Sequence, residues 1–113
     1  MATLSVQIVD RAGDGLTPSL VAAAAGGDEF PNSGREWLVV KNGSGGSITV
    51  TAVTPQTVAG LGVADETYAV PASGERYIGP FPPGTFNNTS TGRVALTYSG
   101  VTSLTVGVFR LGA

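Results

Sequence analysis

Apolar and polar residues alternate with a period of two in several short blocks of this chain. The clearest blocks are residues 4–9, 47–53 and 93–98, in which every second side chain is apolar or aromatic. Successive side chains of a β-strand point to opposite faces, so this alternation predicts strands that bury one face. The same reasoning, with flanking turn residues, predicts further strands at residues 66–70, 75–79 and 104–111.

Residues 36–41, with the sequence Glu-Trp-Leu-Val-Val-Lys, form the most apolar block. A continuous apolar run predicts a strand that is buried on both faces, and therefore a central strand of its sheet. We expect Trp37 to be a core residue for this reason. The other side chains expected in the core are Val39, Ile48, Val50, Leu96, Val106 and Val108.

Turn residues divide the chain into short pieces, since it contains 17 Gly and 7 Pro. Residues 42–46 are predicted to be a hairpin loop, residues 28–35 contain a turn cluster, and residues 56–64 are predicted to be a loop of small apolar residues. Residues 16–27 fit either a helix of about two turns, capped by Thr17, or an extended segment. We prefer the extended segment because its surroundings are predicted to be β-structure.

The pattern as a whole predicts an all-β fold of roughly eight short strands with no long helix. A compact β-sandwich or barrel, of jelly-roll or immunoglobulin-like type, fits this rhythm of strands and turns. The 113 residues suit a single β domain, residues 1–113. Residues 1–12 are interpreted as a possible N-terminal strand or arm.

Composition narrows the chemistry that this domain can perform. The chain has no Cys and no His, which excludes thiolate chemistry, imidazole catalysis and the usual zinc sites. Charged residues make up 12% of the chain, and its six cations are scattered singly, so no nucleic-acid partner is expected. The apolar run at residues 20–25 is far too short to span a bilayer, which needs about 20 residues, so no membrane association is expected.

The chain contains two pairs of adjacent acidic residues that are candidates for acid–base catalysis, Asp28-Glu29 and Asp65-Glu66. Neighbours on a strand point to opposite faces, so neither pair can act together from a strand. We interpret both pairs as solvated turn residues. Residues 10–15 have only part of a calcium-loop pattern and are interpreted as a tight turn. We therefore expect no catalytic residue, no metal and no cofactor, and the protein is predicted not to be an enzyme.

Two segments are candidates for contact with a partner. The first is the stiff apolar loop around Phe81 and Pro82, with Phe86 directly after it, because docking a rigid loop costs little entropy. The alternative is that this loop folds back over the end of the sandwich and places Phe81 in the core. The second candidate is the N-terminal strand with Leu4, Val6 and Ile8, which either adds to the sheet edge of a neighbouring chain or pairs within its own sheet.

Several short segments resemble a known group of proteins. They are Gly15-Leu16-Thr17-Pro18, the Ala run ending in Gly26-Gly27-Asp28, Phe30-Pro31-Asn32, Gly34-Arg35, Val40-Lys41-Asn42, Val70-Pro71-Ala72-Ser73-Gly74 and Ile78-Gly79-Pro80-Phe81-Pro82. The chain resembles, over most of its length, the small capsid decoration (cement) proteins of tailed bacteriophages and prophages, which are encoded beside the major capsid protein. The shared segments are turn and strand signals, so they transfer no functional residue.

The resemblance implies a structural protein on the outer surface of the virion capsid, made in the host cytoplasm. Such a protein bridges subunits of the major capsid protein, stabilises the capsid and is often a homo-oligomer, with a trimer favoured here. One alternative is another β-rich virion component, such as a tail, neck or head-fibre base protein. A second alternative is a carbohydrate-binding β-sandwich module, although a buried Trp37 argues against the exposed aromatic platform that such modules use.

Overall fold

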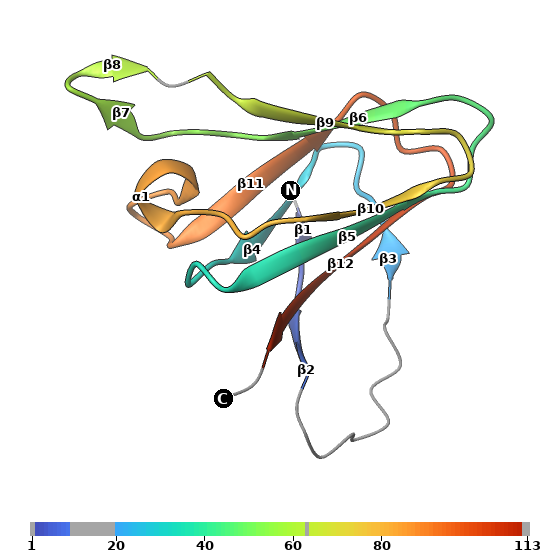
Figure 1. Ribbon diagram of the computed structural model, residues 1–113, viewed down its shortest axis with the longest axis horizontal. Coiled ribbons are helices and arrows are strands. Elements are labelled where there is room, and N and C mark those ends of the chain that lie inside the picture. Colours follow the sequence, from blue (N-terminus) through green and yellow to red (C-terminus); the bar gives the residue numbers. More distant parts are fainter. Residues whose placement is uncertain (1, 10–19, 63, 112–113) are drawn as a thin grey trace.

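The computed structural model describes residues 2–9, 20–62 and 64–111, which fold into two β-sheets packed face to face (Figure 1). The first sheet has, in spatial order, β1 (Ala2–Thr3), β4 (Asp28–Pro31), β11 (Arg93–Tyr98), β6 (Ile48–Ala52) and β9 (Glu66–Val70). The second has β10 (Glu75–Ile78), β5 (Glu36–Asn42), β12 (Leu104–Leu111) and β2 (Val6–Val9), with β3 (Val21–Ala22) also paired to β12. The predicted all-β class is confirmed, and the architecture is a sandwich.

The core lies between the two sheets and follows the period-two pattern. Along β6 the side chains of Ile48, Val50 and Ala52 are buried, while the intervening threonines are only half-buried. The predicted strands at residues 66–70, 93–98 and 104–111 are confirmed with the same bounds. The prediction that residues 36–41 form a central strand is also confirmed, because β5 lies between β10 and β12.

The predicted hairpin loop at residues 42–46 is wrong, because β5 and β6 belong to different sheets. The segment crosses from one sheet to the other and is held by the buried side chain of Asn42. The Asn42 amide nitrogen donates hydrogen bonds to the carbonyl oxygens of Gly46 at 2.8 Å and Val70 at 3.1 Å. Its carbonyl oxygen accepts hydrogen bonds from the backbone and the hydroxyl of Ser44. A hairpin and an arch of this length use the same turn residues, so the pattern does not separate them.

Three other segments differ from their predictions. The turn cluster at residues 28–35 begins with β4, because Asp28–Pro31 pairs with β11. Residues 56–64 contain a two-stranded hairpin, β7 (Thr57–Val58) and β8 (Leu61–Gly62), joined at Ala59 (φ 53°) and Gly60 (φ 79°). The proline loop continues into a short helix, α1 (Pro83–Phe86). In the ambiguous stretch, Val21–Ala22 is a strand, and residues 16–19 lie outside the described residues.

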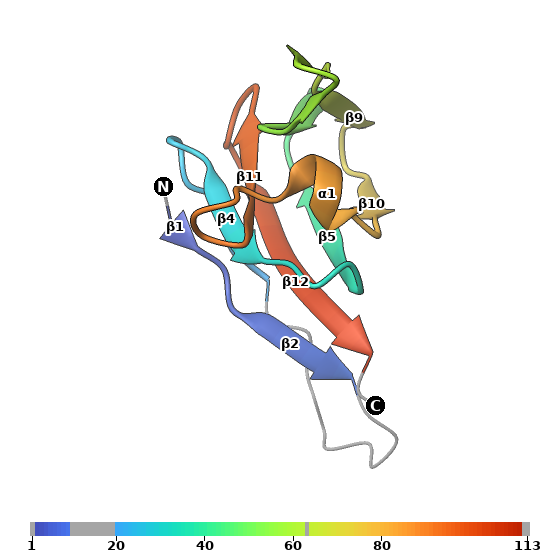
Figure 2. The same ribbon diagram turned by 90° about the vertical axis from the view of Figure 1, so that its left-hand side faces the viewer.

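The N-terminal segment connects the two sheets along one side of the sandwich (Figure 2). β1 runs parallel to β4 in the first sheet, and β2 runs parallel to β12 in the second. The predicted N-terminal strand is therefore paired within its own chain, while residues 10–12 of the proposed arm lie outside the described residues. On the opposite side of the sandwich, the chain passes from β9 to β10 through the turn at residues 71–74.

Candidate interaction site

The N-terminal segment anchors one residue in the core and exposes the next ones. Leu4 is buried, and its backbone N–H donates a hydrogen bond to the carbonyl oxygen of Glu29 at 2.7 Å. The proposal of Leu4 as a partner contact is therefore corrected: its side chain fills the space where the chain crosses between the sheets. Val6 is half-buried, and 46% of Ile8 is exposed.

The outer end of β2 carries exposed apolar side chains on both of its faces. Val9 lies directly opposite Leu111 of β12, and both side chains are exposed, Leu111 by 58%. Ile8, one residue earlier, is exposed on the opposite face of the strand. We call these three exposed apolar side chains around the outer end of β2 the β2 edge patch. Strand β2 is also the last strand of its sheet, so its outer backbone edge has no neighbouring strand among the described residues. The patch thus combines exposed apolar side chains with a position at the end of a sheet.

The proline loop is folded back over one end of the sandwich. Phe81 and Phe86 are both buried, and the Phe81 ring packs against Phe30 and Phe86 at centroid distances of 5.6 and 5.4 Å. The carbonyl oxygen of Phe81 accepts a hydrogen bond from the Asn32 amide at 2.8 Å. Phe81 and Phe86 as partner contacts are therefore corrected, and the folded-back alternative describes this loop. Only Pro82 of this group remains exposed.

Trp37 is not a core residue, which corrects the prediction from the apolar run. It is half-buried on the outer face of the second sheet, where its ring stacks on that of Phe109 at 6.0 Å with an interplanar angle of 26°. Leu38 and Val40 point inward instead. Tyr77 of the neighbouring strand lies opposite Val39 and is 70% exposed. The outer face therefore presents both Trp37 and Tyr77. Period-two alternation within residues 36–42 could have indicated that Trp37 points away from Leu38 and Val40.

The β7–β8 hairpin is a second feature that sequence reasoning missed. It projects beyond the ends of β6 and β9 (Figure 1), and Leu61 near its tip is 72% exposed. The chain carries no charged residue between Lys41 and Asp65, so the hairpin is uncharged. The sequence signal was the pair Ala59-Gly60 between two apolar residues, a spacing typical of a two-residue turn.

The acidic residues Asp28 and Glu29 make hydrogen bonds and an ion pair within the fold. The prediction that Asp28 is solvated is wrong, because Asp28 is only 1% exposed. Its Oδ2 accepts a hydrogen bond from the Tyr98 hydroxyl at 2.7 Å. Burial and the adjacent Asp28 carboxylate raise the pKa of Tyr98 far above its usual value. Glu29 points the other way and pairs with Arg93 at 3.2 Å. The two carboxylates of this pair thus face different surroundings, as the alternation predicted.

Asp65 of the second acidic pair binds the chain at Thr54. Its carboxylate accepts hydrogen bonds from the backbone and the hydroxyl of Thr54 at 2.9 and 3.0 Å. Within residues 2–9, 20–62 and 64–111, no three acidic side chains gather in a way that could hold a metal ion. Among these residues there is also no helix with the length and apolar character needed to cross a bilayer. The exposed surfaces described above are therefore the candidate functional features.

Comparison with known proteins adds no relative to this description. No family model, curated protein or solved structure matches the chain. The class that the fold itself defines is an all-β sandwich of two mixed sheets.

Proposed function

We propose that this protein is a virion structural protein that decorates the outer surface of a tailed-phage capsid and stabilises it by bridging subunits of the major capsid protein. The observation that supports this proposal best is the β2 edge patch of Ile8, Val9 and Leu111. It offers a partner apolar contact at the last strand of a sheet. We also propose a homo-oligomer, with a trimer favoured, and no catalytic activity.

The stabilising mechanism is mass action. A protein that binds only the expanded capsid lattice lowers the free energy of that lattice by its binding free energy. Many identical copies bound around one particle add their separate contributions, so each contact can be weak. The β2 edge patch has only three apolar side chains, which fits a weak single contact.

The test is co-sedimentation of the purified protein with phage heads that lack it, in expanded and unexpanded forms. We expect saturable binding to expanded heads at a fixed ratio to the capsid subunit. Ile8→Asp should weaken this binding at least tenfold, whereas Thr102→Asp, an exposed change in the turn before β12, should leave it unchanged. Binding to neither form would overturn the decoration role and favour a tail, neck or head-fibre base protein.

The outer face of the second sheet supports a second candidate, a carbohydrate-binding module. Trp37 is half-buried there, on the same sheet face as the exposed Tyr77, so the objection that Trp37 lies in the core does not apply. The flat faces of aromatic rings are apolar, so covering them with the apolar face of a sugar is favourable. A glycan array tests this candidate: binding that is lost in Tyr77→Ala and kept in Leu61→Ala would support it. An array without any bound glycan would contradict it.

A further inference from the structure

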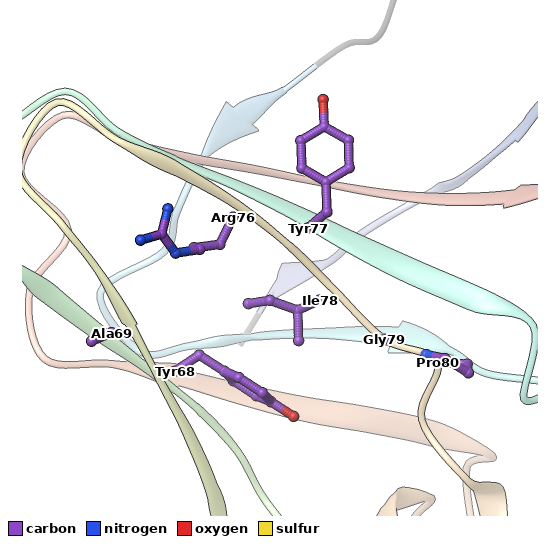
Figure 3. A pocket seen from close by; sticks show the side chains of 7 residues that line it. All are labelled: Tyr68, Ala69, Arg76, Tyr77, Ile78, Gly79 and Pro80. Atoms are coloured by element: carbon purple, nitrogen blue, oxygen red, sulfur yellow. The ribbon is translucent and has the colours of Figure 1, made fainter.

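A cleft opens between the free edges of the two sheets, on the side of the sandwich opposite the N-terminal segment. It has a volume of about 380 Å³ and is lined by Tyr68 and Ala69 of β9 and by residues 76–80 of β10 and its continuation. The side chains of Tyr68 and Ile78 point toward one another across it, while Tyr77 points away (Figure 3). Tyr68 and Ile78 thus face each other inside the cleft, and its two walls are strand edges.

In the part of the chain that the structure describes, the wall formed by β9 has backbone groups that pair with no strand. In β6, Thr49 is bonded toward β11, because its carbonyl oxygen accepts a hydrogen bond from Ser99 N–H at 2.9 Å. The backbone groups of a strand alternate between its two neighbours, so Val50 of β6 bonds toward β9, where it lies opposite Tyr68. It follows that the N–H and C=O groups of the residues on either side, Thr67 and Ala69, point out of the sheet toward the open edge.

The wall formed by β10 follows the same rule. Asn42 N–H donates to the carbonyl oxygen of Gly74 at 2.8 Å, which fixes that pair as the hydrogen-bonded one. Arg76, two residues further, therefore bonds toward β5 as well. The backbone groups of Glu75 and Tyr77 point outward, and neither β9 nor β10 has a second neighbouring strand among the described residues. Each wall of the cleft can therefore pair with one added strand.

Arg76 is the charged residue among those that line the cleft. Arg76 lines the cleft, and its guanidinium is held at the β10 edge by a hydrogen bond to the carbonyl oxygen of Glu75 at 2.9 Å. The ion pairs among the described residues are those of Arg93 with Glu29 and Arg110 with Glu36. Arg76 thus has no carboxylate partner there, although its planar fork has further N–H donors suited to one.

We propose that this cleft binds an extended segment of a partner polypeptide, which adds as a strand to the β10 edge and places a carboxylate side chain against Arg76. The backbone of the segment pairs with Tyr77 and Glu75, and every second side chain enters the cleft between Tyr68 and Ile78. An acidic residue flanked by apolar residues at alternate positions is the sequence this surface selects. The inference depends on the cleft alone and holds whether or not the partner is a capsid protein.

The probe for this site is a displayed library of random linear eight-residue peptides, selected against the immobilised full chain. We expect enriched peptides to carry Asp or Glu among alternating apolar residues. A synthetic copy of an enriched peptide should slow amide hydrogen exchange at Glu75 and Tyr77. The amides of Arg76 and Ile78, which already bond within the sheet, serve as the internal reference.

Two pairs of variants separate strand addition from ordinary surface contact. Tyr77→Pro removes an outward N–H that no strand of the sheet uses, and it should weaken peptide binding at least tenfold, whereas Tyr77→Ala should retain most of it. Arg76→Glu should also weaken binding tenfold and shift the selection toward basic peptides, with Arg35→Glu as the matched exposed control. A selection without enrichment, or peptides bound equally by the parent chain, Tyr77→Pro and Arg76→Glu, would overturn the proposal.

Discussion

The hydroxyl of Tyr98 donates a 2.7 Å hydrogen bond to Asp28 Oδ2 and connects two neighbouring strands of the first sheet through a buried carboxylate. The backbone N–H of Ala24 donates to the same oxygen at 3.2 Å, while Oδ1 is buried without a partner among the described residues. Asp28 therefore depends on few hydrogen bonds, and the loss of any one leaves a buried polar oxygen without a partner.

The change Tyr98→Phe removes this hydroxyl and keeps the ring. We expect the free energy of unfolding to fall by about 1–3 kcal/mol, since a buried acceptor loses its partner. Urea denaturation followed by circular dichroism measures the change. Tyr77→Phe, which removes the hydroxyl of an exposed tyrosine, should leave stability unaltered. Equal midpoints for Tyr98→Phe and the parent protein would show that the hydrogen bond contributes nothing.

Glu36 is expected to make stability depend on pH. Burial opposes ionisation of its carboxylate, but hydrogen bonds from the backbone and hydroxyl of Ser33 and from the backbone of Arg35 outweigh burial and lower the pKa of Glu36. A carboxyl whose pKa is lower in the folded state stabilises the fold above its unfolded pKa of about 4.3. That contribution is lost as the pH falls below this value through the folded pKa.

The variant Glu36→Gln should accordingly lose stability at neutral pH and lose less than the parent protein on acidification. Denaturant unfolding at intervals between about pH 3 and pH 7, around the unfolded pKa, measures how the free energy of unfolding of each protein changes with pH. Glu75→Gln changes an exposed carboxyl and serves as the control. Parallel pH profiles for the parent protein and Glu36→Gln would contradict the assignment.

Asn42→Asp is expected to destabilise the crossing between the sheets. The substitution keeps the acceptor used by Ser44 but removes the donors to Gly46 and Val70, and it places a carboxylate against their carbonyl oxygens. The loss should be at least about 2 kcal/mol, because the side chain is fully buried. Differential scanning calorimetry measures it. Asn88→Asp, in an exposed turn where the side chain only accepts, is the matched control and should unfold at the parent temperature.

Trp37 provides a spectroscopic test of the outer sheet face. It is the single tryptophan of the chain, and its half-buried position predicts that acrylamide quenches its fluorescence in the folded protein. The quenching constant should lie between those of the urea-unfolded chain and a fully buried indole. Phe109→Ala removes the stacked ring and should raise the constant. If acrylamide does not quench the fluorescence of the folded protein, Trp37 is a core residue and its half-buried position is wrong.

Strand positions were largely predictable, because the alternation of apolar and polar residues ended at the same places as the turn-forming Gly and Pro residues. Residues 66–70 end at Pro71, and residues 93–98 begin after Gly92, so both strands have the predicted bounds. The face of Trp37 was not predictable from the apolar run, since a run without polar residues does not show which side chains point inward. Nor could spacing along the chain show that residues 42–46 cross between sheets, because pairing depends on contacts between distant strands.

The candidate contacts were predictable only in part. Among the N-terminal residues, Ile8 is exposed and Leu4 is buried, although both occupy the same phase of the alternation. The difference arises because the chain leaves one sheet and joins the other at Leu4, a crossing that no local pattern encodes. Phe81 is buried against Phe30 and Phe86, and its carbonyl oxygen accepts a hydrogen bond from Asn32, which lies 49 residues earlier in the chain.

The position of β12 in the second sheet has a consequence for how the chain acquires its structure during synthesis. β12 is the shared partner of β2, β3 and β5, yet it follows all of them in the sequence. On a ribosome, those three strands emerge before the strand that joins them exists, so this sheet cannot assemble progressively from the N-terminus. Closure through such distant pairings is slow compared with local contacts. The nascent chain therefore holds Val6–Val9 and Glu36–Asn42 without their common partner until residues 104–111 have left the exit tunnel, which makes this interval its most vulnerable to association with other chains.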